Sequence, residues 1–111
     1  MNTIKFDQYR EQANQFLKQK KFSEALEFYD KCLKITRKAT TLDNIAVYVN
    51  KLACLLSLER YTQVITECND AFRLVKNYKN RNDGRHSEEE LQRIKQMELR
   101  IAVRKGNALT K

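Results

Sequence analysis

Apolar residues recur along most of the chain at intervals of three and four, the spacing typical of one face of an α-helix. The clearest stripe runs from Ala25 to Ile35, and Ser23 is placed to cap the start of that helix. The same spacing predicts five helices: about 3–20, a second after 21–22, a third from about 41, a fourth after 61–62, and a fifth of some 20 residues after 87.

The clearest break in this pattern is the polar segment 77–86, which carries the turn-forming sequence Asn82-Asp83-Gly84. We expect a loop there, with His86 solvated. Ser87 and Glu90 follow with the spacing of a capping box, in which each residue satisfies a backbone N–H of the other. The 111 residues include no proline and two glycines. So few turn-formers disfavour a β-sandwich or barrel, and the predicted fold class is all-α.

The first two predicted helices repeat in the next two. Ala25 and Val64 occupy matching positions 39 residues apart, close to the roughly 34-residue period of a helix-turn-helix repeat. An aromatic residue, Phe22 or Tyr61, opens the second helix of each pair. Unrelated helical hairpins need not share aromatic, small and apolar residues in register, so the pattern indicates a repeat protein.

These residues resemble the tetratricopeptide repeat over nearly the whole chain. The resemblance implies an α-solenoid of antiparallel helix pairs with about five helices. Gly106 and Ala13 stand where the family has a small residue, whereas Leu52 departs from the pattern and the usual closing proline is absent. Leu52 and Gly106 are 54 residues apart, about 20 more than the period, and we assign the excess to longer fourth and fifth helices and the turn at Gly84. The expected single domain, 1–111, comprises repeat one at about 6–38, repeat two at about 43–78, an extended link at 79–98, and the first helix of repeat three, or a capping helix, at 99–111.

In one branch of this family, co-chaperones hold the C-terminal Glu-Glu-Val-Asp tails of Hsp70 and Hsp90 in a carboxylate clamp. The resemblance places the five clamp positions at Arg10, Asn14, Asn50, Arg100 and Arg104. Arg10 and Arg100 stand where the family usually has lysine, which keeps the charge but changes reach and geometry. Residues four apart share a helix face, and both arginine and asparagine donate hydrogen bonds to carboxylates. We therefore expect one groove that binds a free acidic C-terminus.

Other residues are expected to extend this groove. Val49, Ala53 and Leu56 fall on the groove side of the third helix, where they could pack an apolar ligand residue. Lys18 is a candidate contact for acidic residues further up the ligand, and Asn107 is a candidate groove residue on the fifth helix.

The charge balance favours an acidic partner. The chain has 22 Lys and Arg against 14 Asp and Glu, a formal net charge of +8. The leading hypothesis is a co-chaperone or adaptor domain serving protein clients or a co-chaperone complex. The elongated link before the third repeat, together with the segment 102–106, looks like the tetratricopeptide domains of cytoplasmic dynein-arm assembly co-chaperones. Two alternatives remain: a scaffold that grips an internal peptide, and a basic nucleic-acid-binding repeat, whose binding would depend steeply on salt.

Several activities are disfavoured by what the sequence does not contain. Nucleotide-binding, hydrolase and metalloprotease motifs are absent, so we do not expect an enzyme or a cofactor. Cys32, Cys54 and Cys68 lack the paired spacing of a zinc site and are expected to be buried thiols in a reducing compartment. The first residues do not form the apolar run of a signal peptide, so a cytoplasmic location and no membrane partner are expected.

Overall fold

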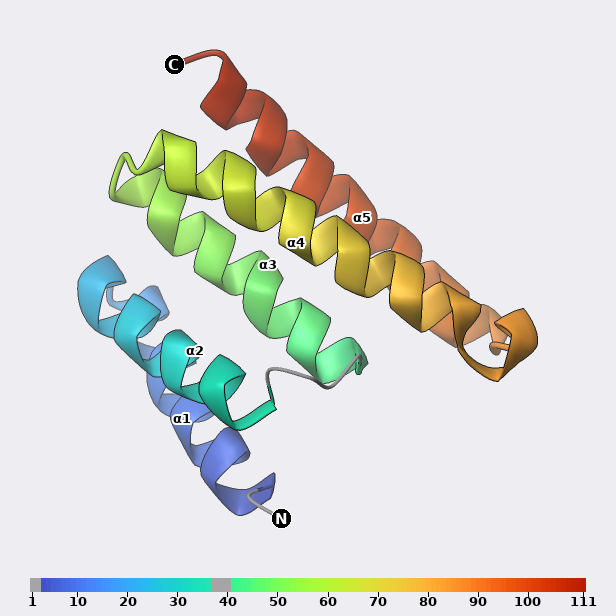
Figure 1. Cartoon of the computed structure of the whole chain (residues 1–111). Helices are drawn as coiled ribbons and strands as arrows, with labels where there is room; N and C mark the ends of the chain where they lie inside the picture. The colour runs from blue at the N-terminus through green and yellow to red at the C-terminus, as the bar shows by residue number, and fades with distance from the viewer. Residues whose placement is uncertain (1–2, 37–40) are drawn as a thin grey trace.

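A computed structural model describes residues 3–36 and 41–111, and within them it confirms the all-α fold with five α-helices and no strand (Figure 1). A short 3-10 helix, Arg81–Gly84, precedes the last α-helix. The α-helices are α1 (Thr3–Lys18), α2 (Phe22–Thr36), α3 (Leu42–Ser57), α4 (Tyr61–Asn80) and α5 (Glu88–Leu109).

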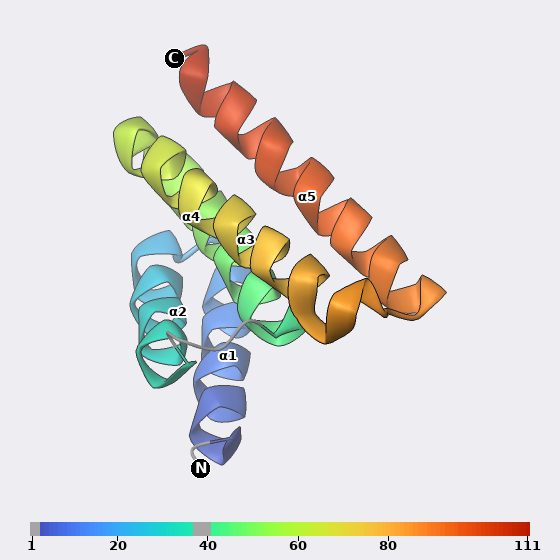
Figure 2. The same ribbon diagram turned by 45° about the vertical axis from the view of Figure 1, so that its right-hand side comes forward.

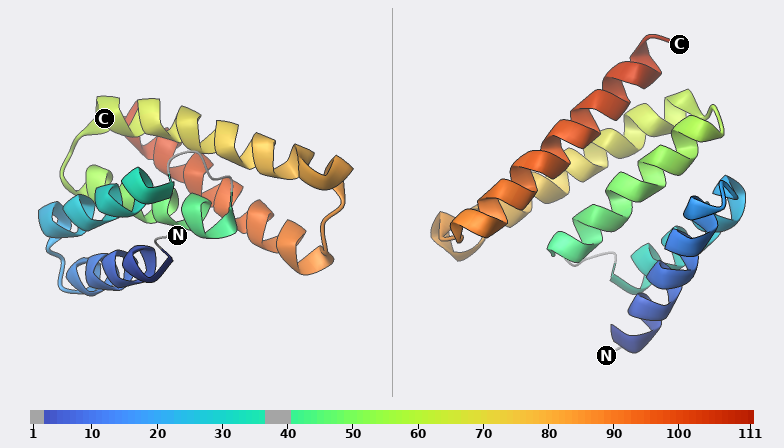
Figure 3. Two further views of the ribbon diagram at one scale, coloured as in Figure 1. Left: turned by 60° about the horizontal axis from the view of Figure 1, so that its bottom comes forward. Right: turned by 180° about the vertical axis from the view of Figure 1, so that it is seen from behind.

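The helices pack in sequential pairs and form two layers. Each helix contacts the next along the chain, and α3 also contacts α5. Figure 1 shows the successive helices in order from α1 to α5. Figure 2 shows α1 between α2 and the later helices, and the right-hand view of Figure 3 shows α1, α3 and α5 on one face with α2 and α4 behind them. The molecule measures 38 × 36 × 21 Å, and its smallest dimension is about twice the 10 Å diameter of a helix. This is the architecture of a helical-repeat solenoid.

The two helical hairpins turn in the same way. Lys20 and Glu59, 39 residues apart, both have a φ of 60°, the left-handed conformation that commonly ends a helix. In each turn, the backbone N–H of the next residue donates to a carbonyl five residues earlier: Lys21 to Phe16 and Arg60 to Leu55, both at 2.9 Å. The repeat inferred from side-chain types is therefore also a repeat of backbone geometry.

Lysines on the first helices contact the preceding repeat in the same register. The Lys51 Nζ on α3 lies 2.7 Å from Oδ1 of Asp30 on α2. The Lys105 Nζ on α5 lies 2.9 Å from Oδ1 of Asn69 on α4, and Asn69 is 39 residues after Asp30. Hence α5 contacts α4 through a lysine in the same register as the lysine by which α3 contacts α2. The largest fully buried side chains between these layers are Tyr29, Ile45, Leu52, Leu55, Ile94 and Ile101.

The segment 77–86 is more ordered than its sequence suggested. Helix α4 continues to residue 80, and the 3-10 helix takes up residues 81–84. The expectation of a solvated His86 was wrong: its side chain is 4% exposed, its ring stacks on Tyr78 with centroids 4.7 Å apart, and its Nε2 lies 3.2 Å from the Lys79 carbonyl. A stacked ring and a backbone contact replace the solvation that a polar neighbourhood implies.

The start of α5 follows the sequence prediction. Ser87 caps the helix, and both hydrogen bonds of the capping box with Glu90 are present. Glu90 also accepts a hydrogen bond from the Tyr78 hydroxyl. That bond, followed by the Ser87 backbone N–H, lowers the pKa of Glu90 from 4.5 to about 2.

Two smaller expectations were corrected. Helix α2 begins at Phe22 rather than after Ser23, because the Ala25 N–H already donates to the Lys21 carbonyl in a helical bond. Helix α1 ends at Lys18 rather than residue 20, because the chain turns after Lys18 and Lys20 has the left-handed conformation. The end proposed for repeat one, residue 38, lies outside the described residues. The cysteines are buried thiols, as expected, and none of the three forms a disulfide. No helix in the described ranges is long and apolar enough to cross a membrane.

Candidate peptide-binding groove

A hollow of about 340 Å³ lies between α3 and α5. Its lining combines four apolar side chains with two arginines and one amide, all presented by two helices. Five lining residues were predicted from the sequence: Ala53, Leu56, Arg100, Arg104 and Asn107. Leu99 and Val103 complete the lining, and their spacing of four residues on the fifth helix is the sequence signal that could have placed them there. The hollow therefore offers apolar surface beside hydrogen-bond donors.

Arg104 joins this hollow to the middle of α3. Its Nη1 donates to the Val49 carbonyl at 2.8 Å, and the side chain is partly buried. Burial lowers the pKa of Arg104, and the positive charge of Arg100 lowers it further. Since the two guanidinium groups repel one another, a carboxylate placed between them would be stabilised by both.

Two predicted amides, Asn14 of α1 and Asn50 of α3, meet at one hydroxyl. Tyr29 is a fully buried residue of α2, and its hydroxyl donates to the Asn14 Oδ1. Asn50 interacts with the same hydroxyl. Burial, followed by Cys54, raises the pKa of Tyr29 to about 12, so the tyrosine remains a donor at neutral pH. With its oxygen held by Tyr29, Asn14 has its NH₂ group to offer to a carboxylate.

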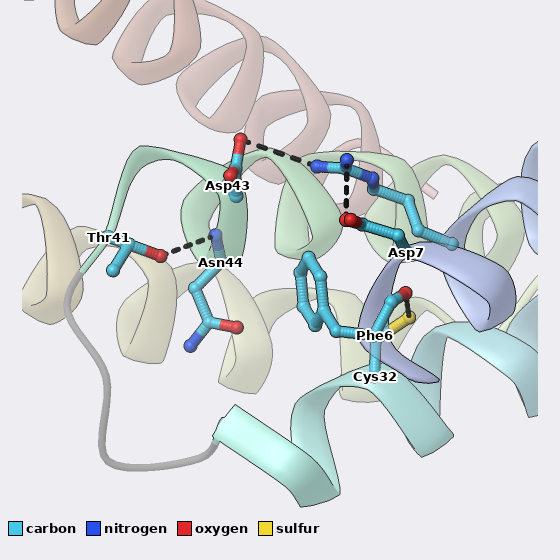
Figure 4. A network of polar contacts seen from close by, with 7 residues as sticks. Phe6, Asp7, Cys32, Thr41, Asp43 and Asn44 are labelled. Carbon is cyan, nitrogen blue, oxygen red and sulfur yellow. Dashed lines mark hydrogen bonds and ion pairs between the residues drawn. The ribbon is translucent and has the colours of Figure 1, made fainter. Parts of the chain in front are cut away.

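Arg10, the remaining clamp candidate, is held by two carboxylates. It lies 3.1 Å from Asp7 on the same helix and 3.3 Å from Asp43 on α3; both carboxylates are labelled in Figure 4. Its guanidinium also lies over the Phe6 ring, 5.2 Å from the centroid. Its charge is therefore partly compensated, and a ligand would have to compete with the two aspartates for it.

Two groove candidates lie elsewhere. Val49 is buried, so its carbonyl and not its side chain contributes, by accepting from Arg104. The rotation of α3 about its axis places Ala53 and Leu56 in the lining of the hollow and the Val49 side chain in the core. Lys18 is exposed at the end of α1 and is not part of the lining.

A second hollow, of about 440 Å³, lies on the other side of α1 and contains none of the predicted residues. Gln8 and Gln15 line it. The matching positions of the next repeat, 39 residues later, are Val47 and Cys54, and both are buried. Polar residues at these positions are typical of the end of a repeat array. Its lining contains one carboxylate and no basic residue, and consists of Gln8, Tyr9, Glu11, Gln12, Gln15 and Phe28. The α3–α5 hollow is the better candidate.

The fold is thus an all-α array of sequential helix pairs, consistent with a helical repeat like the tetratricopeptide repeat, with a basic, amide-containing groove between α3 and α5. The chain is similar to Sperm-associated antigen 1 of Rattus norvegicus (33% identity over 69 residues, 62% of this chain and 7% of that protein) and of Homo sapiens (32% over 70 residues, 63% and 7%). It is also similar to the Hsp70/Hsp90 co-chaperone CNS1 of Saccharomyces cerevisiae (32% over 65 residues, 59% and 17%).

These similarities confirm the resemblance stated from sequence as a distant homology to co-chaperones that contain tetratricopeptide repeats. The chain spans less than a fifth of the length of each of these relatives. No family model matches the sequence, and no solved structure matches it.

Proposed function

We propose that this domain binds the acidic C-terminal Glu-Glu-Val-Asp tail of Hsp90 or Hsp70 through a carboxylate clamp, as a non-catalytic co-chaperone or adaptor. The observation that carries the proposal is the pairing of Arg100 and Arg104 with Asn107 beside an apolar hollow. The distant relationship to an Hsp70/Hsp90 co-chaperone supports the choice of ligand.

The ligand chemistry matches the groove in two respects. A tail that ends in aspartate presents two carboxylates at its last residue, and the clamp would hold them with Arg100, Arg104, Asn14 and Asn50. The preceding valine is apolar and suits the hollow's aliphatic surface. Each charge-assisted hydrogen bond contributes about 1.5–3 kcal/mol, so a few such bonds support micromolar affinity, near −8 kcal/mol, after the costs of association.

The contributions within the clamp should be unequal. Arg100 is exposed and lies in the groove lining, so it can engage the ligand without giving up an observed ion pair. Arg10 would exchange Asp7 and Asp43 for the ligand carboxylate. Such an exchange yields little net free energy, so we assign most of the affinity to the α5 arginines and the two amides.

Calorimetric titration with a Glu-Glu-Val-Asp peptide and its C-terminally amidated form tests the proposal. The free acid should bind at least about tenfold more tightly, because amidation removes one charged acceptor worth about 1.5 kcal/mol. Arg100→Ala should lose a similar factor. Arg85→Ala, which removes the same charge from an exposed residue before α5, should bind like wild type.

A further variant addresses the amides. Tyr29→Phe removes only the hydroxyl that holds Asn14, so tail affinity should fall several-fold while helix content stays the same. Equal binding of the two peptide forms would show instead that the groove takes an internal segment. Binding of duplex DNA with a steep salt dependence and no peptide binding would favour the nucleic-acid alternative.

A further inference from the structure

The junction between α4 and α5 holds an imidazole ring that takes no part in the proposed clamp. His86 is the only histidine of the chain, and it lies in the turn that joins the two helices (Figure 1). Its ring stacks on Tyr78 of α4, with the centroids 4.7 Å apart and the planes inclined by 19°. Although its sequence neighbours are polar, its side chain is 4% exposed.

Both ring nitrogens of His86 face oxygens that accept hydrogen bonds. The Nε2 lies 3.2 Å from the Lys79 carbonyl oxygen on α4, and the Nδ1 lies 3.5 Å from Oε2 of Glu90 on α5. A carbonyl and an ionised carboxylate have no proton to donate, so each contact needs a proton on the ring nitrogen. The imidazolium ion carries both protons, whereas the neutral ring leaves one bare nitrogen facing an acceptor.

The surroundings of Glu90 keep it an acceptor. The Tyr78 hydroxyl donates to the carboxylate oxygen that faces His86, and the Ser87 backbone N–H donates to the other oxygen. These bonds lower the pKa of Glu90 to about 2. The carboxylate therefore stays ionised over the whole range, between about pH 5 and 8, in which histidine side chains gain or lose a proton.

The other charged groups at this junction act on different atoms. The Lys79 ammonium pairs with Glu98 of α5 at 2.7 Å. Burial, followed by Glu90, raises the pKa of Tyr78, and the charges of Arg81 and Arg93 act in the opposite direction. Tyr78 is therefore a neutral donor at pH 7, and the negative charge in contact with the ring comes from Glu90.

We propose that His86 forms a pH-sensitive contact between α4 and α5. When protonated, the ring bonds to the Lys79 carbonyl on α4 and to Glu90 on α5. When it loses a proton, it keeps the shorter contact with Lys79 and loses the bond to Glu90. Because protonation adds a contact in the folded chain that the unfolded chain lacks, the folded state gains stability at the acidic end of the range and loses it as the pH rises toward 8.

Thermal unfolding at constant ionic strength, followed by circular dichroism, tests this proposal. The Tm of wild type should fall by about 2–5 °C between pH 5.5 and 8, as expected for one partly exposed ion pair. His86→Gln keeps a side-chain donor but does not titrate, so its Tm should be nearly constant over the same range. Nitrogen NMR of the single imidazole should show protons on both ring nitrogens at pH 5.5 and on Nε2 alone at pH 8.

Two further variants make the test specific. Glu90→Gln removes the charge that faces the ring but keeps a side chain able to form the capping box, so most of the fall in Tm between pH 5.5 and 8 should disappear. Gln96→His combined with His86→Gln moves the histidine to an exposed position of α5, and its Tm should not depend on pH. A constant Tm in wild type, an equal fall in His86→Gln, or a neutral ring with its proton on Nδ1 overturns the proposal.

Discussion

Replacing Lys51 with methionine would remove the centre of an ion-pair network that joins three helices. Its Nζ lies 2.7 Å from Asp30 of α2 and 2.5 Å from Glu67 of α4, and Gln63 donates to Glu67 at 2.7 Å. Burial lowers the pKa of Lys51, but hydrogen bonds to Asp30 and Glu67 outweigh it and raise the pKa overall. The ammonium group is therefore charged at neutral pH, and methionine deletes that charge while keeping most of the volume.

The burial of each partner sets the size of the effect. The side chains of Lys51 and Glu67 are 12% and 11% exposed, whereas Asp30 is 47% exposed. Loss of one partner from a buried ion pair costs about 3–5 kcal/mol, because the other charge remains uncompensated. The pair with Asp30 adds about 1 kcal/mol or less because water screens it, and Gln63 retains one hydrogen bond to Glu67. We expect Lys51→Met to lower the unfolding free energy by about 3 kcal/mol.

Urea unfolding followed by circular dichroism measures this loss, provided that the slope with urea is unchanged. The double variant Lys51→Met with Glu67→Met should lose much less, because it leaves no buried charge. Lys34→Met, an exposed position of α2, should change stability by less than about 0.5 kcal/mol. A loss below about 1 kcal/mol in the single variant, or an equal or larger loss in the double variant, would refute the reasoning.

Three further predictions concern binding, the turns and pH. Asp43→Asn releases Arg10 from a partly exposed ion pair. Calorimetry should then show about two- to fivefold tighter binding of the acidic tail. An unchanged affinity would exclude Arg10 from the clamp. Lys20→Gly and Glu59→Gly place glycine, which adopts a positive φ without strain, at the two left-handed positions. Each should add up to about 1 kcal/mol of stability in thermal melts. A loss of stability would mean that Lys20 and Glu59 are not strained. The pKa of Glu90 is about 2 in the folded state, against an ordinary value of 4.5, so the stabilisation from its carboxylate is present above pH 4.5 and is lost as the pH falls toward 2. Glu90→Gln should therefore reduce the fall in Tm between pH 4.5 and 2. A Tm profile that matches wild type would assign the acid sensitivity to other groups.

The elements of the fold could be predicted because each has a local cause. The five helices follow from apolar spacing, and the start of α5 follows from Ser87 and Glu90, whose side chains act within one turn of the backbone. The repeat follows from residues in register 39 positions apart. The cap predicted at Ser23 was wrong, because its N-cap preference is weaker than the helical hydrogen bond that the Ala25 N–H donates to the Lys21 carbonyl.

The site was less predictable because it depends on how helices rotate against one another. Ala53 and Leu56 face the α3–α5 hollow as expected, whereas Val49 turns inward and offers its carbonyl instead. Tyr29 was read only as part of an apolar stripe, and its contact with Asn14 spans 15 residues of sequence. Arg10 was chosen for its charge, and its pairing with Asp43 depends on the approach of α1 to α3. Such contacts are set by tertiary packing, which the spacing along one helix does not specify.

Three arginines of the proposed clamp contribute to the net charge of +8, and each has a different environment. Arg10 is compensated by two aspartates, Arg104 is anchored to the α3 backbone, and Arg100 is the exposed member of the α5 pair. The positive potential at the groove therefore depends mainly on where α5 lies. Its position is fixed from the opposite side, where Ile101 is fully buried and Lys105 bonds to Asn69. Selectivity for an acidic terminus would then rest on the packing between α4 and α5 as much as on the residues that touch the ligand, and substitutions there should weaken binding without touching the groove.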